Sequence, residues 1–93
     1  MTPELRTLIY IEVYPENLET VRASLSVCYP GWTPLTRIEE RIEGIIPMEI
    51  ALDAPSGEWT YHDDMFFKMR PGIRKFEKLD AQQWYRAIIS KEA

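Results

Sequence analysis

Residues that form covalent or metal cross-links are scarce in this sequence. Cys28 is the single cysteine and His62 the single histidine among 93 residues. One thiol cannot form a disulfide within the chain, and structural zinc sites draw most of their four ligands from cysteine and histidine. We therefore expect a fold held together by packing, with no metal and no cofactor.

Long apolar runs are scarce as well. The uninterrupted apolar stretches are short, such as Leu8 to Ile11, whereas a helix needs roughly 20 apolar residues to cross a membrane. No basic segment followed by an apolar one opens the chain, as it would in a secretory leader. These absences predict a cytoplasmic protein without a membrane-spanning segment.

Local signatures of common enzymes are missing too. The sequence contains no GxxxxGK[ST] or GxGxxG phosphate loop, no GxSxG nucleophile turn and no HExxH zinc motif. His62, Asp63 and Asp64 are the one cluster that could bind an ion or transfer a proton, and a solvated bulge or turn explains them more simply. Cys28 falls on the apolar side of an expected helix, where small buried thiols are common. We predict that the protein is not an enzyme.

The composition that is present is typical of a small folded domain. Apolar residues make up 45% of the chain and charged residues 28%, as in globular proteins and unlike disordered ones. A chain of 93 residues suits one hydrophobic core. We therefore expect one domain over residues 1–93.

The first third of the chain has clear periodicity. β-Branched and aromatic residues alternate from Arg6 to Tyr14, which predicts a strand. Pro15 then suits a helix start, and apolar residues at helical spacing predict a helix to Cys28. This opening resembles that of ferredoxin-like domains, but the elements expected further on lack the second βαβ unit of that plan, so no family is assigned.

Residues 34–43 have two interpretations. Thr33 matches an N-cap with proline after it, and apolar residues at helical spacing favour a short helix that ends at Gly44. Against the helix, three glutamates crowd its negative end. A strand is the alternative, but it would place a carboxylate among apolar neighbours. We favour the helix.

The rest of the chain predicts three strands and a last helix. Residues 45–53 alternate, residues 54–57 are a turn, residues 58–70 form the returning strand, and residues 73–79 form an edge strand. Residues 80–90 predict a terminal helix. The fold class expected is α+β, in the order β-α-α-β-β-β-α, with an antiparallel sheet of about four strands and helices packed on one face. The expected core consists of Thr7, Ile9, Ile11, Val13, Leu18, Val21, Leu25, Met48, Ile50, Phe67, Trp84 and Ile88.

Charge is unevenly distributed along the chain. Residues 1–67 contain four basic and twelve acidic side chains, a formal charge of −8, and residues 68–93 contain seven basic and three acidic ones, a formal charge of +4. A field of one sign steers encounter with an oppositely charged partner. Alternatively, the two parts meet in the fold and neutralise each other.

Some acidic residues are explained by local structure and others are not. Glu39, Glu40 and Glu43 oppose the dipole of the expected helix, and such a local conflict is typical of a functional site. Pairing with Arg37 and Arg41 is the alternative explanation. We expect these glutamates, together with the acidic pair at positions 63–64, to contact a partner.

Trp32 is the aromatic residue with the least obvious core role. It lies between two prolines, which stiffen the loop and reduce the entropy lost on binding. It can act as the apolar anchor of an interface, or it can fold back onto the next helix as a staple. Both roles stay open.

The function predicted first is a small acidic protein–protein interaction module, a regulator or inhibitor that binds a more basic macromolecule such as a nucleic-acid-binding protein or a toxin. Its expected partner-binding residues are Trp32, Glu39, Glu40, Glu43, Asp63 and Asp64. The alternative is a dimeric small-molecule-binding or enzymatic domain with polar groups from Tyr10, Tyr14, His62 and Asp64. A third hypothesis is a nucleic-acid binder working through the basic residues 68–78, which a pI near 5.0 disfavours.

Overall fold

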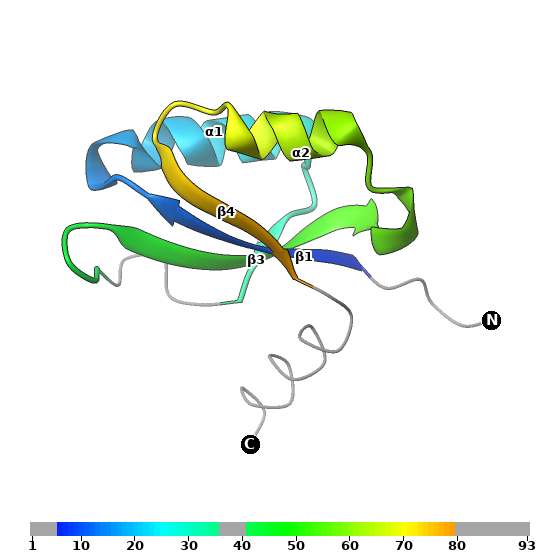
Figure 1. Cartoon of the computed structure of the whole chain (residues 1–93), viewed down its shortest axis with the longest axis horizontal. Helices are drawn as coiled ribbons and strands as arrows, with labels where there is room; N and C mark the ends of the chain where they lie inside the picture. The colour runs from blue at the N-terminus through cyan, green and yellow to red at the C-terminus, as the bar shows by residue number, and fades with distance from the viewer. Residues whose placement is uncertain (1–5, 36–40, 80–93) are drawn as a thin grey trace, which may run out of the picture.

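The computed structural model describes residues 6–35 and 41–79, which form one antiparallel sheet of four strands and two α-helices (Figure 1). Both helices lie against the same face of the sheet. The predicted α+β class, with its four-stranded antiparallel sheet and one-sided helix layer, is therefore confirmed. Within these residues, no helix is long and apolar enough to span a membrane.

The first strand and helix form much as their periodicity predicts. In β1, Arg6–Val13, every second residue from Thr7 onward is fully buried on the face that carries the helices. Pro15 starts a 3₁₀ turn, Pro15–Asn17, because its fixed φ suits the first helical position. The helix α1, Leu18–Cys28, then buries Val21 and Leu25. Cys28 is exposed, so the buried thiol expected there is wrong.

The helix expected over residues 34–43 is wrong at its first residues. Thr33–Pro34 form the short strand β2, which pairs with Ala51 and Ile50 of the neighbouring strand. Leu35 N extends this pairing with a 2.8 Å hydrogen bond to the carbonyl oxygen of Glu49. Charges that oppose the dipole make a helix less stable here, and pairing with β3 provides the backbone hydrogen bonds of this segment instead.

The far end of the same stretch is a turn. Ile42 and Ile45 exchange backbone hydrogen bonds of 2.8 and 3.1 Å. Between them, Glu43 and Gly44 have φ angles of 52° and 82°, so Gly44 serves a tight turn and does not cap a helix. Residues 36–40 lie outside the described residues.

The third strand begins where the alternation predicts and runs longer. β3, Ile46–Pro55, buries its alternate residues from Ile46 to Leu52 under the helices, as expected. The predicted turn at residues 54–57 does not reverse the chain into another strand. Instead, a 3₁₀ turn at Ser56–Glu58 leads into a second helix.

The strand expected over residues 58–70 is wrong, because α2, Tyr61–Lys68, occupies this stretch. Thr60 and Asp63 form a capping box: the Asp63 carboxylate accepts from Thr60 N at 2.9 Å, and the Thr60 hydroxyl accepts from Asp63 N at 3.4 Å. Acidic residues in the first turn and Lys68 in the last turn suit the helix dipole. The expected bulge at residues 62–64 is therefore the first turn of a helix.

The last described strand, β4, Ile73–Leu79, is confirmed, but its neighbour differs from the meander expected. It pairs antiparallel with β1, and the strand order is β2-β3-β1-β4. The observed order β-α-β-β-α-β is that of the ferredoxin-like or split-βαβ plan. The second βαβ unit that the sequence analysis expected to be missing is supplied by α2. The terminal helix expected over residues 80–90 lies outside the described residues.

The core lies between the sheet and the two helices. Phe67 of α2 is fully buried and stacks on Phe76 of β4, with ring centroids 5.0 Å apart. Trp59 stacks nearly parallel to both rings, with centroids 6.1 Å from each. Leu18 is only partly buried, and positions 84 and 88 lie outside the described residues. The other predicted core residues are buried, namely Thr7, Ile9, Ile11, Val13, Val21, Leu25, Met48, Ile50 and Phe67.

Candidate functional site

Three segments meet at one end of the domain: the end of α1, the last residues of β3 and the start of α2. Tyr29, directly after α1, donates a 2.6 Å hydrogen bond from its hydroxyl to Asp63 Oδ1 in α2. Gly31 N donates a 2.8 Å hydrogen bond to Asp53 Oδ2 in β3. These contacts bring the carboxylates of Asp53 and Asp63 close enough to Tyr29 for both charges to act on its phenol.

The Tyr29–Asp63 pair is strongly polarised. Burial, the hydrogen bond to Asp63 and the nearby negative charges all raise the pKa of the Tyr29 phenol. Burial alone would raise the pKa of Asp63, but hydrogen bonds from Tyr29 and Thr60 outweigh it and lower that pKa below its usual value. Tyr29 therefore stays protonated and Asp63 stays ionised at neutral pH.

Asp64 is held by a separate set of contacts. Its Oδ1 accepts a 2.7 Å hydrogen bond from the indole N–H of Trp59, and its Oδ2 pairs with Lys68 Nζ at 3.0 Å. The hydrogen bond from Trp59, followed by that from Lys68, lowers the pKa of Asp64. Both predicted aspartates are thus ionised and have fixed orientations, and their carboxylate oxygens are already hydrogen-bonded within the chain.

Trp32 lies beside this network, against the edge of the core. Its backbone N–H donates to Tyr29 O at 2.9 Å, and its indole N–H donates to Ser26 Oγ at 3.1 Å. The ring is partly buried against core residues. Trp32 therefore folds back onto α1, and not onto a following helix as the staple hypothesis expected.

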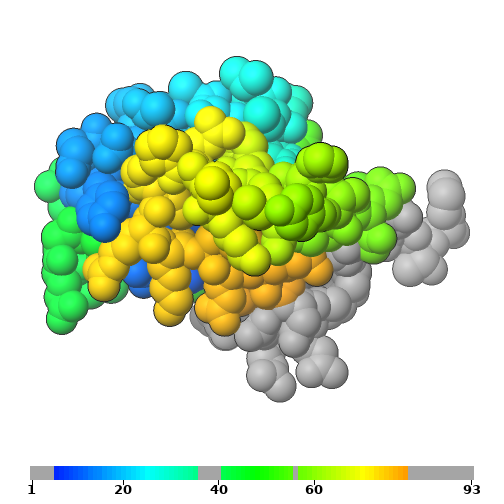
Figure 2. All heavy atoms as spheres, turned by 45° about the horizontal axis from the view of Figure 1, so that its top comes forward, coloured from blue at the N-terminus to red at the C-terminus, as the bar shows by residue number. Residues whose placement is uncertain are grey.

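Two exposed residues complete this end of the domain. Glu58 is exposed two residues before the N-cap Thr60, and the Tyr61 side chain is 73% exposed. The segment that carries them projects at one end of the molecule (yellow-green in Figure 2). We call this surface the acidic end, and it comprises Asp53, Glu58, Asp63 and Asp64 with Trp32 and Tyr61.

The structure therefore brings together three of the six predicted partner-binding residues, Trp32, Asp63 and Asp64. Glu43 is not among them, because it lies before the first residue of β3, whereas Asp53 lies near the last residue of that strand. Strand geometry makes that separation roughly 25 Å. Glu39 and Glu40 lie outside the described residues, so their predicted role stays a prediction.

Sequence analysis missed three members of the acidic end: Asp53, Glu58 and Tyr61. Asp53 looked like the exposed residue of an alternating strand, and nothing local indicated that it would accept a hydrogen bond from Gly31. A side chain at Gly31 would place its Cβ 2.8 Å from Asp53 Cβ, so a glycine is needed there. The Thr60–Asp63 spacing was the available signal for a helix start, and it would have shown Tyr61 as a first-turn residue.

The basic residues of the stretch 68–78 are engaged within the chain. Besides Lys68 on Asp64, Arg74 Nε lies 3.9 Å from Glu12 Oε1. Lys78 Nζ lies 5.9 Å from the Trp59 ring, Lys75 Nζ lies 6.0 Å from the Tyr10 ring, and Arg70 stacks on Phe66. The aromatic residues that would have stacked on bases, Phe67 and Phe76, stack on each other. For the four basic residues other than Arg70, these contacts favour a structural role over phosphate binding.

The polar groups of the predicted small-molecule site do not converge. Tyr10 lies on the face of β1 opposite the helices, where its hydroxyl donates a 2.7 Å hydrogen bond to Glu12. Burial, this hydrogen bond and neighbouring glutamate charges raise the pKa of Tyr10 to about 12. Asp64, by contrast, lies in the helix layer. The described residues contain no group of three or more potential metal ligands.

Comparisons with protein-family models, with curated proteins and with solved structures found no significant match. The ferredoxin-like order of elements carries no function with it, since one fold serves many activities. Function must therefore be inferred from the surface chemistry of this chain.

Proposed function

We propose that this chain is a protein-interaction module, a regulator or inhibitor that binds a more basic macromolecule through the acidic end. The observation that carries the proposal is that Asp53 and Asp63 are held by the segment that follows α1, with Asp64 next to Asp63 in α2 and the exposed Glu58 and Tyr61 flanking the start of that helix. The four carboxylates outnumber the three cations that approach this end, namely Arg6 on the Gly31 carbonyl, Lys68 on Asp64 and Lys78 beside Trp59. An excess of one sign of charge steers an oppositely charged partner. An exposed aromatic ring is the type of side chain that anchors such an interface.

The residues of the acidic end have different roles in this proposal. Asp63 and Asp64 already accept hydrogen bonds within the chain, so they act through their charge. Glu58 and Tyr61 are exposed, and the described structure gives them no hydrogen bond to a side chain. We therefore assign direct contact with the partner to Glu58 and Tyr61.

The fixed geometry of this end supports a role in binding. Asp63 is held by the capping box of α2 and by Tyr29, and Asp64 by Trp59 and Lys68. Charges whose orientation is set before binding lose little conformational entropy when the partner arrives. The same network stabilises the fold, so a substitution at Asp63 or Asp64 could abolish binding simply by unfolding the domain. Tests must use the exposed residues.

The test is an affinity capture from the native cells with three baits: the unaltered chain, Glu58→Lys with Tyr61→Ala, and the matched control Glu16→Lys with Tyr14→Ala. The control makes the same two types of substitution near the other end of the sheet, where Glu16 is exposed and Tyr14 is 41% exposed. Thermal melts first establish that all three baits are folded.

We expect the unaltered and control baits to retain the same basic protein, identified by mass spectrometry, and the acidic-end variant to lose it. Equal capture by all three baits would show that the partner binds elsewhere. Retention of only acidic or neutral partners would contradict the charge argument. Loss by the control bait alone would assign recognition to the other end of the domain.

A further inference from the structure

A second candidate site lies on the helix layer. It is a groove of about 560 Å³ between α1 and the turn that follows α2. This volume is within the usual range for small-molecule sites, roughly 300–1,000 Å³, and the groove is shallow, because five of its seven lining residues are exposed. Its wall on α1 carries small side chains at helical spacing, and its other wall is one cation. The lining residues are Glu19, Thr20, Ala23, Ser24, Val27, Cys28 and Arg70.

Arg70 is the unusual residue of this groove. Its guanidinium lies 4.1 Å from the centroid of the Phe66 ring, which fixes the plane of the group. Its Nε is buried, and in the described part of the chain no acceptor reaches it. A buried donor without an acceptor costs free energy, so such groups are rare in native structures. Because Nε is enclosed, a ligand in the groove can reach only the Nη groups of the guanidinium, and these are the donors that Arg70 presents to an anion.

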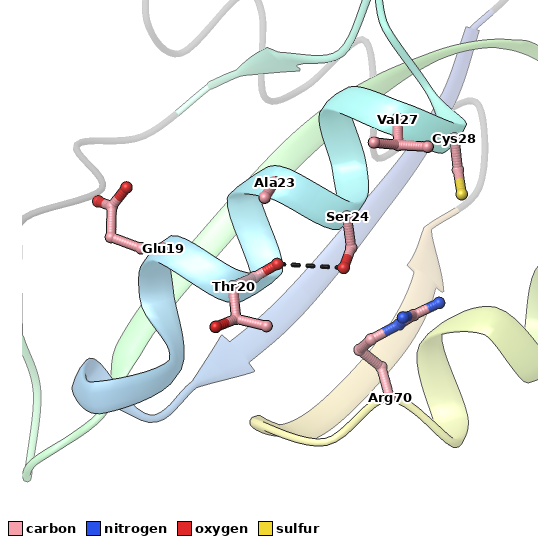
Figure 3. A pocket seen from close by; sticks show the side chains of 7 residues that line it. All are labelled: Glu19, Thr20, Ala23, Ser24, Val27, Cys28 and Arg70. Carbon is pink, nitrogen blue, oxygen red and sulfur yellow. Dashed lines mark hydrogen bonds between the residues drawn. The ribbon is translucent and has the colours of Figure 1, made fainter.

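The arrangement of the groove favours an anion over a cation. Figure 3 shows Ser24 and Cys28 projecting from α1 on the side where Arg70 lies, whereas Glu19 projects away from it. Glu19 is also within 3.9 Å of Arg22, which partly offsets its charge. The overall charge of the chain is −4, but exposed charges are screened within about 8 Å at physiological ionic strength. The local field of Arg70 thus governs what binds beside it.

The remaining lining is mostly apolar. Val27 is 80% exposed, and Ala23 and Thr20 also line the groove. Arginine binds carboxylates through two parallel hydrogen bonds, which orient the anion in the plane of the guanidinium. We propose that the groove binds a small organic carboxylate, with its carboxylate on Arg70 and its apolar body against α1.

Cys28 provides a direct way to test this proposal. It is exposed, it lines the groove, and it is the single cysteine of the chain. A ligand seated beside Arg70 shields its thiol. The experiment measures the labelling rate of Cys28 by the neutral reagent 4,4′-dithiodipyridine, with and without indole-3-acetate. Indole-3-acetamide, which has the same body and no charge, is the matched control ligand.

We expect the acid to slow labelling in a saturable way and the amide to have little effect. A ligand of this size binds with a dissociation constant of roughly 1 mM, so about 10 mM acid slows labelling about 10-fold. Arg70→Gln should abolish the protection, and Arg74→Gln, which removes a charge on β4, should retain it. Ala23→Phe fills the groove from an exposed position and should also abolish it.

Three results would overturn the proposal. The first is the absence of saturable protection by indole-3-acetate or benzoate in the unaltered chain. The second is equal protection by acid and amide, which would remove Arg70 from recognition. The third is equal protection by inorganic phosphate, which would indicate an anion site without an apolar part. If Arg70→Gln proves unfolded by circular dichroism, Ala23→Phe and the acid–amide pair still decide the matter.

Discussion

Replacing Tyr29 by phenylalanine removes one hydroxyl from the acidic end and leaves the ring in its packed position. The ring is 8% exposed and packs edge-on against Phe66, at 5.5 Å, and in a stack with Phe67, at 5.8 Å. Neither contact involves the hydroxyl. The substitution therefore isolates the 2.6 Å hydrogen bond to Asp63.

The structure sets the stability loss expected from Tyr29→Phe. A hydrogen bond to a charged group contributes roughly 1.5–3 kcal/mol. Asp63 keeps its bonds to Thr60 and is only partly shielded from water, so the loss should lie near the lower limit, about 1–2 kcal/mol. The matched control is Tyr61→Phe, because the described structure shows no hydrogen bond to the exposed Tyr61 hydroxyl. It should leave stability unchanged.

The pH dependence of the stability lost in Tyr29→Phe is a second test of the hydrogen bond to Asp63. Asp63 has a lower pKa in the folded chain than in the unfolded one, so its ionised form contributes stability above a pH of about 4. That contribution disappears as the pH falls through the folded pKa. The difference between the unaltered chain and Tyr29→Phe should be full at pH 7 and should shrink below about pH 4.

The free energy of unfolding is measured by urea unfolding at pH 7 and pH 3 for the unaltered chain, Tyr29→Phe and Tyr61→Phe. Our reasoning would be refuted if Tyr29→Phe were as stable as the unaltered chain at pH 7, within about 0.5 kcal/mol. It would also be refuted if the difference grew as the pH fell.

Three further substitutions test the fold and the opposite sheet face. Gly72→Ala should lower the free energy of unfolding by more than about 1 kcal/mol in urea melts, because Gly72 has φ of 92° and an added Cβ would lie 2.5 Å from Asn17 Cβ. The control is Gly57→Ala, whose added Cβ meets no atom within 4 Å and should change that free energy little. Phe67→Ala should cost about 3–5 kcal/mol in the same assay, since Phe67 is fully buried among aromatic rings; a cost below about 1 kcal/mol would contradict the packing of α2. Tyr10 has a pKa raised to about 12, so its un-ionised form contributes stability that is present below pH 10 and lost toward pH 12. Tyr10→Phe should therefore reduce the fall in stability between pH 10 and pH 12. An identical fall in both proteins would contradict the raised pKa of Tyr10.

The elements with a single strong signal could be predicted from the sequence. β1 alternates over eight residues and α1 follows a proline, and both are found where expected. The stretch 58–70 carried two signals: alternating apolar residues that suit a strand, and the Thr60–Asp63 spacing that suits a helix start. The capping box prevailed because it satisfies backbone donors at both residues. Local alternation could not reveal that Phe67 packs on β4.

The candidate site was predictable only in its residue types. Trp32 was identified from its place between two prolines, and Asp63 and Asp64 from their clustering in the sequence; the structure places all three at one end. Their hydrogen bonds to Ser26, Tyr29 and Trp59 depend on tertiary contacts that no local pattern encodes. The groove beside Arg70 is likewise invisible in the sequence, where that arginine belongs to a generally basic stretch. Its distinction is that no acceptor in the described structure reaches its Nε.

The measurement that tests our central claim most directly is the association rate of the captured basic partner as a function of salt. The unaltered chain, the acidic-end variant Glu58→Lys with Tyr61→Ala, and the control Glu16→Lys with Tyr14→Ala are compared by surface plasmon resonance. We predict that the acidic-end variant associates about 10-fold more slowly at low salt, with a flatter salt dependence, while the control stays within about 2-fold of the unaltered chain. An unchanged association rate for the acidic-end variant at low salt would contradict the claim that this end recognises the partner.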